Sequence, residues 1–192
     1  MKPAPAKSVV ELAHYLLDRG KPDYRFLAYE LVAHHQGALR SLGPVELERL
    51  GRGIDSWESV DTFGIYLSGP VWRERQVPDR LIRRWARSDD RWWRRAALVS
   101  TVPLNMKSRR GKGDPERTLA VCEILIADRD DMVVKALSWA LRELAEREPA
   151  RVRAFIRSHE PELPARALRE VRNKLKTGLK NPRTARPTRR KA

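Results

Sequence analysis

A tryptophan and an aspartate lie four residues apart in the stretch SWESVDTFG, at Trp57 and Asp61. On a helix this spacing puts both side chains on one face, one turn apart. The face of a tryptophan ring attracts cations, each such contact being worth about 0.5–2 kcal/mol. A carboxylate can stabilise the positive charge that a sugar acquires while its glycosidic bond breaks. The pair therefore suits a ligand that is, or becomes, cationic; the alternative is ordinary packing beside a solvated helix acid.

Three stretches of similar sequence could position such residues. They begin at Asp55 (DSWESVDTFG), Asp89 (DDRWWRRAALVS) and Asp130 (DDMVVKALSWAL). Their starts lie 34 and 41 residues apart, a period typical of stacked helix pairs of the HEAT or armadillo type. An aspartate at a helix start can cap the helix or complement its dipole. The repeat therefore predicts three helices that stack in parallel.

The unusual residues of the three stretches occupy matching positions. Counted from each initial aspartate, Trp57 is at offset two, Asp61 and Arg95 are at offset six, and Trp139 is at offset nine. Offsets two, six and nine follow an i, i+4, i+7 pattern and share one face of a helix. We therefore predict a catalytic group of Asp61, Trp57, Trp139 and Arg95. Taken singly, each of these residues is more typical of a core, a solvated face or an ion pair.

The rest of the chain is rich in Leu, Ala, Arg and Glu and lacks alternating apolar runs, so helices are expected and strands are not. The fold class predicted is an all-α solenoid of HEAT-like or armadillo-like repeats with a concave basic surface, the alternative being a plain helical bundle. We expect one domain over residues 1–180 and a disordered basic tail over 181–192. The helices are expected near 8–20 (with Ser8 and Glu11 as a capping box), 24–35, 43–50, 56–66, 78–88, 90–102, 115–127, 130–146, 149–158 and 164–176.

The charge of the chain indicates a polyanionic partner. Forty Lys and Arg against 25 Asp and Glu give +15, and seven of these basic residues, with no acid, lie from Lys176 to the end. The remainder still carries +8, which favours nucleic acid, although an arginine-rich solvated surface has the same composition. The residues predicted to bind DNA flank the repeat helices or lie in the loop KSRRGKG: Arg91, Arg94, Lys107, Arg109, Arg110, Lys112 and Lys135.

Other chemistries have little support in the sequence. The four histidines show no metal-ligand spacing, and Cys122 is the single cysteine, in the apolar run LAVCEILI, where we expect it to be a small buried residue. Neither a G-x-S-x-G elbow nor a Walker phosphate loop occurs. There is no apolar run of membrane-spanning length and no signal peptide. We expect a cytoplasmic, monomeric protein without metal or cofactor.

Three of these segments resemble a known family. SWESVD, WWRRAALVS followed by TVPLN, and DDMVVKALSWALRE are similar to the DNA alkylation repair family, the AlkD-like HEAT-repeat DNA glycosylases. The resemblance spans residues 22–180. It implies an α-solenoid that cradles duplex DNA and hydrolytically removes cationic alkylated purines of the 7-methylguanine and 3-methyladenine type, without taking the lesion into a deep pocket and without a cofactor.

The resemblance also implies a role for each residue of the catalytic group. Trp57 and Trp139 would contact the deoxyribose of the lesion, Asp61 would stabilise the oxocarbenium ion and position water, and Arg95 would hold the DNA backbone. Relatives usually carry a further helical segment before the matched region, and this chain begins almost directly at it. Two other functions therefore remain open: a non-catalytic nucleic-acid-binding module of the same fold, and a HEAT-type scaffold that binds protein.

Overall fold

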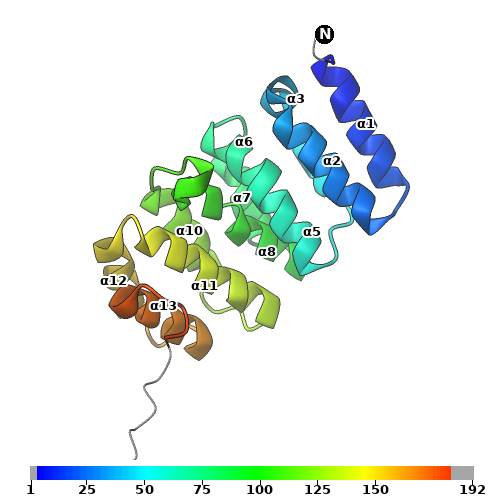
Figure 1. Ribbon diagram of the computed structural model, residues 1–192. Helices are drawn as coiled ribbons and strands as arrows, with labels where there is room; N and C mark the ends of the chain where they lie inside the picture. Colours follow the sequence, from blue (N-terminus) through cyan, green and yellow to red (C-terminus); the bar gives the residue numbers. More distant parts are fainter. Residues whose placement is uncertain (1–3, 183–192) are drawn as a thin grey trace, which may run out of the picture.

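The structure is a computed structural model in which residues 4–182 are described. This part of the chain is helical throughout, without a strand, and forms an α-solenoid. In Figure 1 the helices follow one another from α1 at the upper right to α12 and α13 at the lower left. Residues 183–192, which make up most of the tail predicted to be disordered, lie outside the described residues.

The helical elements are, in chain order, α1 (Ala6–Asp18), α2 (Pro22–His34), α3 (Gln36–Ser41), α4 (Pro44–Gly51), α5 (Trp57–Phe63), the π-helix η1 (Gly64–Ser68), α6 (Gly69–Arg73), α7 (Asp79–Trp85), α8 (Arg91–Val99), α9 (Val102–Asn105), the 3-10 helix η2 (Lys107–Arg109), α10 (Pro115–Ile124), α11 (Asp131–Ala145), α12 (Pro149–Ser158) and α13 (Ala165–Thr177).

Five of these helices pack side by side and form what we call the site row: α2, α5, α8, α11 and α13. Each contacts the next member of the row, as expected for a solenoid in which every repeat touches only its neighbours. The remaining long helices pack against this row, α1 on α2, α7 on α8, α10 on α11, and α12 on α11 and α13. Side chains that point outward from the site row can therefore form one continuous surface.

The helices predicted from periodicity are confirmed, whereas some of their predicted starts are wrong. Asp130 caps α11 as expected, whereas α8 is capped by Asp90 and not by Asp89; each side chain accepts a hydrogen bond from a backbone N–H (2.8 Å in both). The predicted capping box at Ser8 is wrong, since α1 begins two residues earlier, at Ala6. Ser56, and not Asp55, caps α5.

Aromatic side chains form part of the core between the two sets of helices. Phe63, Trp85 and Trp93 make a cluster with ring centroids 4.9–6.0 Å apart. Trp72 and Trp85 are only 1% and 3% exposed, so they are core residues, as expected for most tryptophans of a helical protein. Cys122 is fully buried, which confirms its expected role as a small apolar side chain. Within residues 4–182, no helix is both long and apolar enough to cross a bilayer.

Candidate active site

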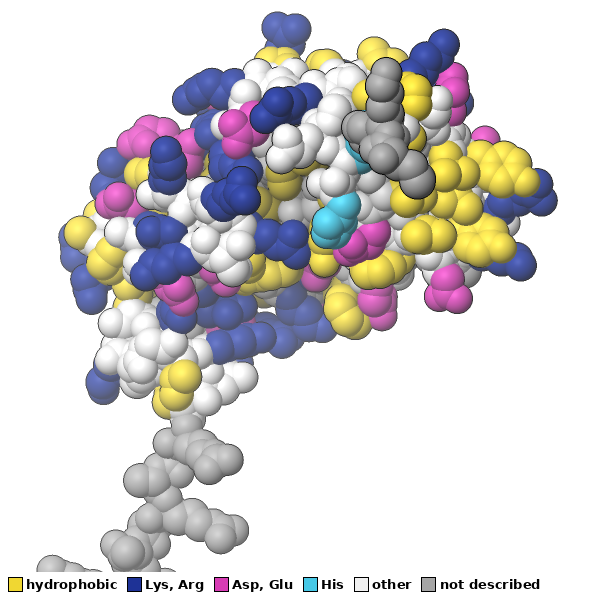
Figure 2. Space-filling model, turned by 45° about the horizontal axis from the view of Figure 1, so that its top comes forward, with side chains coloured by type: hydrophobic (Ala, Val, Ile, Leu, Met, Phe, Trp, Pro, Cys, Tyr) yellow, Lys and Arg dark blue, Asp and Glu magenta, His cyan; other side chains and the backbone are white. Residues whose placement is uncertain are grey.

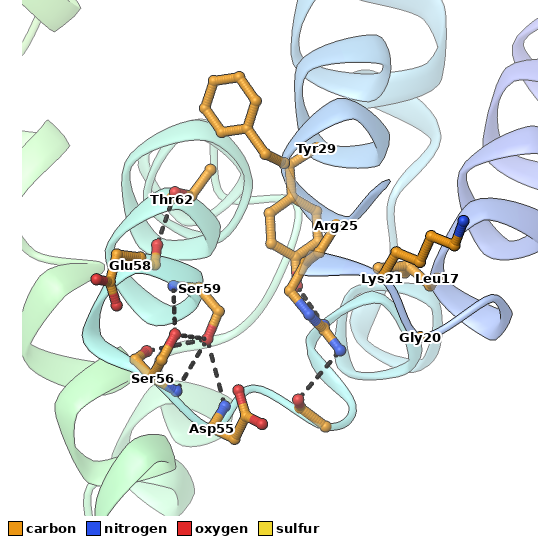
Figure 3. A pocket seen from close by; sticks show the side chains of 12 residues that line it. Leu17, Gly20, Lys21, Arg25, Tyr29, Asp55, Ser56, Glu58, Ser59 and Thr62 are labelled. Atoms are coloured by element: carbon orange, nitrogen blue, oxygen red, sulfur yellow. Dashed lines mark hydrogen bonds between the residues drawn. The ribbon is translucent and has the colours of Figure 1, made fainter. Parts of the chain in front are cut away.

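The first turn of α5 is fixed by a reciprocal serine cap. Ser56 Oγ accepts a hydrogen bond from the Ser59 backbone N–H (3.2 Å), and Ser59 Oγ accepts one from the Ser56 backbone N–H (3.2 Å). Figure 3 shows these bonds converging at the start of the helix. Such a capping box satisfies backbone donors that a helix start otherwise leaves unpaired. The cap sets the position of Trp57, at the first helical residue, and of Asp61 one turn later.

Small residues let α5 and η1 approach α8 closely. A Cβ atom placed on Gly64 would lie 2.5 Å from Val99 Cγ1, so only glycine fits at this crossing. Beyond it, the hydroxyls of Ser68 and Ser100 are buried and lie 2.6 Å apart. Gly64 follows Asp61 by three residues, and Val99 follows Arg95 by four. The close crossing therefore brings Asp61 and Arg95 within reach of each other.

Asp61 and Arg95 form a bidentate ion pair between α5 and α8. Arg95 Nε donates to Asp61 Oδ1 (2.9 Å) and Arg95 Nη2 donates to Asp61 Oδ2 (2.8 Å). The remaining guanidinium nitrogen, Nη1, donates to the Met132 carbonyl on α11. The Arg95 side chain is 6% exposed and that of Asp61 18%. Arg95, expected to hold the DNA backbone, is in this structure bonded to Asp61 and to the third helix instead.

Two opposing effects act on the Asp61 carboxyl. Burial raises its pKa above the ordinary value, because a desolvated carboxylate is disfavoured. The hydrogen bonds and charge of Arg95 lower the pKa and offset part of this effect, while the neighbouring Glu58 raises it slightly further. The net direction is upward. The carboxylate is thus a stronger base than an exposed aspartate, and Arg95 keeps it oriented.

The two tryptophans lie on one cavity that α5, α8, α11 and α13 of the site row share. Trp57 from α5, Arg95 from α8, and Trp139 from α11 all line it. Trp57 is 51% exposed, unlike the core tryptophans, and its ring is available to a ligand. The Trp139 ring is held in place because its Nε1 donates to Glu143 Oε1 (3.1 Å). Three residues of the predicted catalytic group therefore line one cavity, and the fourth, Asp61, lies behind its lining, bonded to Arg95.

The residues predicted to bind DNA are placed differently from one another. Lys135 lines the cavity and pairs with Asp131 (2.6 Å). Arg91 is half exposed at the start of α8. Arg94 is mostly buried, because its Nε donates to Asp128 Oδ2 (2.7 Å) and its Nη1 donates to two backbone carbonyls. Of these three, Arg94 has the least freedom to meet a ligand.

The basic loop of residues 107–113 lies outside the cavity lining. Arg109 stacks over the ring of Tyr66, 4.3 Å from its centroid, and is partly covered. The side chains of Lys107, Arg110 and Lys112 are exposed. The loop is fixed to the turn that follows α11, since Arg147 Nε donates to the Asn105 carbonyl (3.1 Å) just before the loop and its Nη2 donates to the Gly111 carbonyl within it. Lys107, Arg110 and Lys112 therefore form an exposed basic segment separate from the cavity.

A second cavity, of about 320 Å³, lies farther along the site row between α2 and α5 (Figure 3). Arg25 closes one side of it, donating to Tyr29 Oη (2.9 Å) and to the carbonyl of Gly53 (3.0 Å). Lys21 and Arg25 face Asp55 and Glu58 among its lining residues, so its charges balance. Because its cationic groups are matched by acids, this cavity is not suited to bind an anion.

In residues 4–182 no group of three or more His, Cys, Asp or Glu side chains could hold a metal ion. The site chemistry available to the described chain is therefore that of a held carboxylate, two aromatic faces and several cations.

Comparison with known protein families decides where the chain belongs. A model of the DNA alkylation repair enzyme family matches residues 1–175, most of the chain. The chain belongs to this family. A search of curated proteins found no match. Membership in the DNA alkylation repair family assigns the chain to that process and indicates an enzyme that acts on DNA.

Four residues of this family member line the cavity but were missing from the predicted group: Met132, Arg142, Arg166 and Lys180. One signal could have found the first two. Residues 132, 135, 139 and 142 follow helical spacing on α11, so Met132 and Arg142 share the face of Lys135 and Trp139. Arg166 and Lys180 carry no such signal, because they come from outside the three repeat stretches.

Proposed function

We propose that this protein is a DNA N-glycosylase that hydrolytically removes cationic alkylated purines, of the 7-methylguanine and 3-methyladenine type, from duplex DNA. One observation carries the proposal: a partly buried carboxylate, Asp61, is held by a bidentate arginine beside a cavity with two tryptophan rings. An acid in so basic a surrounding repels phosphates. It becomes useful when positive charge develops on the ligand.

The proposed reaction breaks the bond between the sugar C1′ and the purine nitrogen. The electron pair of that bond moves onto the purine, which neutralises its positive charge and makes it a good leaving group. The sugar becomes an oxocarbenium ion, which Asp61 stabilises electrostatically. Water then adds to C1′, and its proton passes to the Asp61 carboxylate, whose raised pKa favours acceptance. The products are the free base and an abasic site.

The surrounding side chains have separate tasks in this proposal. Trp57 and Trp139 offer their ring faces to the cationic sugar, each contact contributing about 0.5–2 kcal/mol. Arg95 fixes the orientation of the carboxylate, so it acts as a positioning residue. The exposed cations at residues 91, 107, 110 and 112 and the partly exposed Lys135 would bind the phosphates of a duplex lying along the site row.

The test is the release of 7-methylguanine from a duplex that contains it at one position, measured by chromatography of the free base. We expect release by the wild type and a loss of about 100-fold or more in Asp61→Asn, which removes the negative charge. Asp18→Asn, on the exposed end of α1, makes the same change in net charge away from the site and is expected to behave as wild type. Absence of release by the wild type, or equal rates for the two variants, would refute the proposal.

The same ion pair also supports a second candidate, a non-catalytic DNA-binding protein. Arg95 neutralises Asp61 in the structure, so the pair could serve only to join α5 to α8. This candidate requires binding that weakens steeply with salt and does not depend on alkylation. Tight, salt-dependent binding of equal strength to alkylated and plain duplexes, without base release, would establish it over the glycosylase.

A further inference from the structure

Within the part of the chain that the structure describes, the cavity beside the tryptophans is lined by five cations and by no acid. The cations are Arg95, Lys135, Arg142, Arg166 and Lys180. Arg95 is bonded to Asp61, and Lys135 is bonded to Asp131, which also accepts a hydrogen bond from Arg166 Nη1 (2.9 Å). The other three lie at the far side of the cavity, on α11, on α13 and in the segment after α13. Figure 2 shows dark blue side chains gathered close to the last described residues, where α13 lies.

A buried carboxylate organises these three cations. Glu170, on α13, is 2% exposed. Its Oε1 accepts a hydrogen bond from Arg166 Nε (3.1 Å), and its Oε2 lies 3.6 Å from Lys180 Nζ. Oε2 also accepts from the hydroxyl of Ser138 (2.6 Å), whose oxygen in turn accepts from Arg142 Nε (3.2 Å). Glu170 thus orients Arg166 and Lys180 directly and Arg142 through Ser138, while Asp131 holds the other end of the Arg166 guanidinium.

Arg142 is the least satisfied of the three. Within residues 4–182 its side chain makes one hydrogen bond, from Nε to Ser138, and no ion pair with a carboxylate. Burial lowers the pKa of Arg142, because the charge has lost water without gaining a direct partner, and the nearby charges of Glu170 and Glu143 offset only part of this effect. Its two terminal nitrogens, Nη1 and Nη2, therefore remain as donors on the cavity side.

Lys180 is brought to the cavity by the turn that ends α13. Gly178 adopts a left-handed conformation (φ 76°), which glycine accepts without strain and which reverses the chain direction. Asn173 Nδ2 then donates to the Lys180 carbonyl (3.1 Å) and fastens the segment back onto the helix. The position of Lys180 is thus set by local hydrogen bonds as well as by Glu170.

We propose that Arg142, Arg166 and Lys180 form a phosphate subsite assembled on Glu170, which binds a phosphodiester of the DNA strand that carries the lesion. A guanidinium with two free donors matches the geometry of two phosphate oxygens, and the lysine adds a point charge. The subsite lies next to Trp139, so a phosphate held there places its sugar against the aromatic ring. This inference rests on the proposed function, since it assumes that DNA occupies the cavity.

The subsite is tested by DNA binding at several salt concentrations, with Arg142→Ala compared against Arg169→Ala. Arg169 is exposed on α13 and does not line the cavity, so both variants lose one charge from the same region. We expect Arg142→Ala to weaken binding roughly tenfold or more and to reduce the slope of log affinity against log salt by about 1. Arg169→Ala is expected to change affinity less than about twofold. Arg142→Lys, which keeps the charge and loses the fork, should be intermediate.

Neutral linkages locate the phosphate that the subsite binds. Duplexes are prepared with a single methylphosphonate at each linkage around the lesion in turn. For the wild type, one such linkage should weaken binding about tenfold, and the same substitution should have no effect on Arg142→Ala, because the contact is already lost. A urea unfolding curve for each variant shows whether it is folded.

The results separate this inference from the proposed function. The subsite is overturned if Arg142→Ala and Arg169→Ala bind DNA with equal affinity. It is also overturned if every methylphosphonate linkage weakens Arg142→Ala as much as it weakens the wild type. Base release by the wild type would continue in both cases. A wild type that binds no duplex at any salt concentration would overturn both. Millimolar inorganic phosphate gives a further test. If it weakens DNA binding by the wild type but not by Arg142→Ala, and the two proteins bind DNA equally well without it, the cations belong to a site for a free anion. That result would also overturn the inference.

Discussion

Replacing Arg95 by methionine tests whether the Asp61–Arg95 pair holds the site together. The substitution keeps much of the side-chain volume but removes both hydrogen bonds to Asp61 and the one to Met132. Breaking a buried ion pair by removing one partner typically costs about 3–5 kcal/mol, because the other charge stays buried without compensation. The Asp61 side chain retains 18% exposure, so we expect the lower end, roughly 3 kcal/mol.

The effect is measured by urea unfolding, followed by far-ultraviolet circular dichroism, for Arg95→Met, Asp61→Asn and the double variant. The coupling energy from this cycle is expected to be about 2–3 kcal/mol. Arg172 and Glu160 supply the control, since both side chains of that pair are about half exposed. The exposed pair should give only about 0.2–1 kcal/mol.

The reasoning fails if the coupling of Asp61 with Arg95 does not exceed that of the exposed pair. A second readout separates a structural effect from a chemical one. Without Arg95, both contributions that lower the pKa of Asp61 disappear, so this pKa rises further. The acid limb of any base-release activity should therefore move to higher pH in Arg95→Met. An unchanged limb would show that the carboxylate does not depend on its partner.

Two further predictions concern packing and pH. Gly64→Ala should lower the free energy of unfolding, measured in urea, by about 1–3 kcal/mol, because the new methyl group would lie 2.5 Å from Val99. Adding Val99→Ala should restore part of the loss. A gain in stability for Gly64→Ala would contradict the close crossing of the two helices. The pKa of Glu170 is lowered: burial would raise it, but hydrogen bonds from Ser138 and Arg166 and the nearby cations outweigh burial. The Glu170 carboxylate should thus contribute fully to stability above the ordinary glutamate pKa of about 4.3, and this contribution should be lost as the pH falls through the lower pKa of the folded state. The free energy of unfolding of Glu170→Gln should therefore depend less on pH over that range. An unaltered pH dependence would contradict the lowered pKa.

The helices could be predicted because their apolar faces follow a helical period and several begin with good caps. The short helices α3, α6 and α9 were not predicted. They contain glycine or proline, and they have too few residues for the helical period of apolar residues to be recognised. Register was harder. The first repeat stretch begins with Asp55, yet Ser56 makes the cap, because a serine three residues later completes the reciprocal pair. Local competition between two capping residues decides such starts.

The members of the candidate site were predictable from repeat position, whereas their contacts were not. Asp61 and Arg95 lie 34 residues apart, and nothing in the sequence states that one neutralises the other. Their pairing depends on how closely two helices cross, which the glycine at position 64 determines. The contacts of Arg142 were not predictable either: helical spacing places it on the face of Trp139, but only the three-dimensional surroundings show that it donates to Ser138 and has no direct carboxylate partner among residues 4–182.

The position of α13 at the end of the site row has a consequence for how tightly a ligand is bound. Among the helices described, α13 packs appreciably on α11 and α12 only, while α11 is held on several sides. A helix that packs on few neighbours opens with a smaller free energy than one that is packed on several sides. Arg166 and Lys180 leave the cavity whenever α13 undocks, although Trp57, Asp61 and Arg95 stay in place. The apparent affinity for a phosphate is therefore the intrinsic affinity scaled by the fraction of molecules in which the last helix is docked.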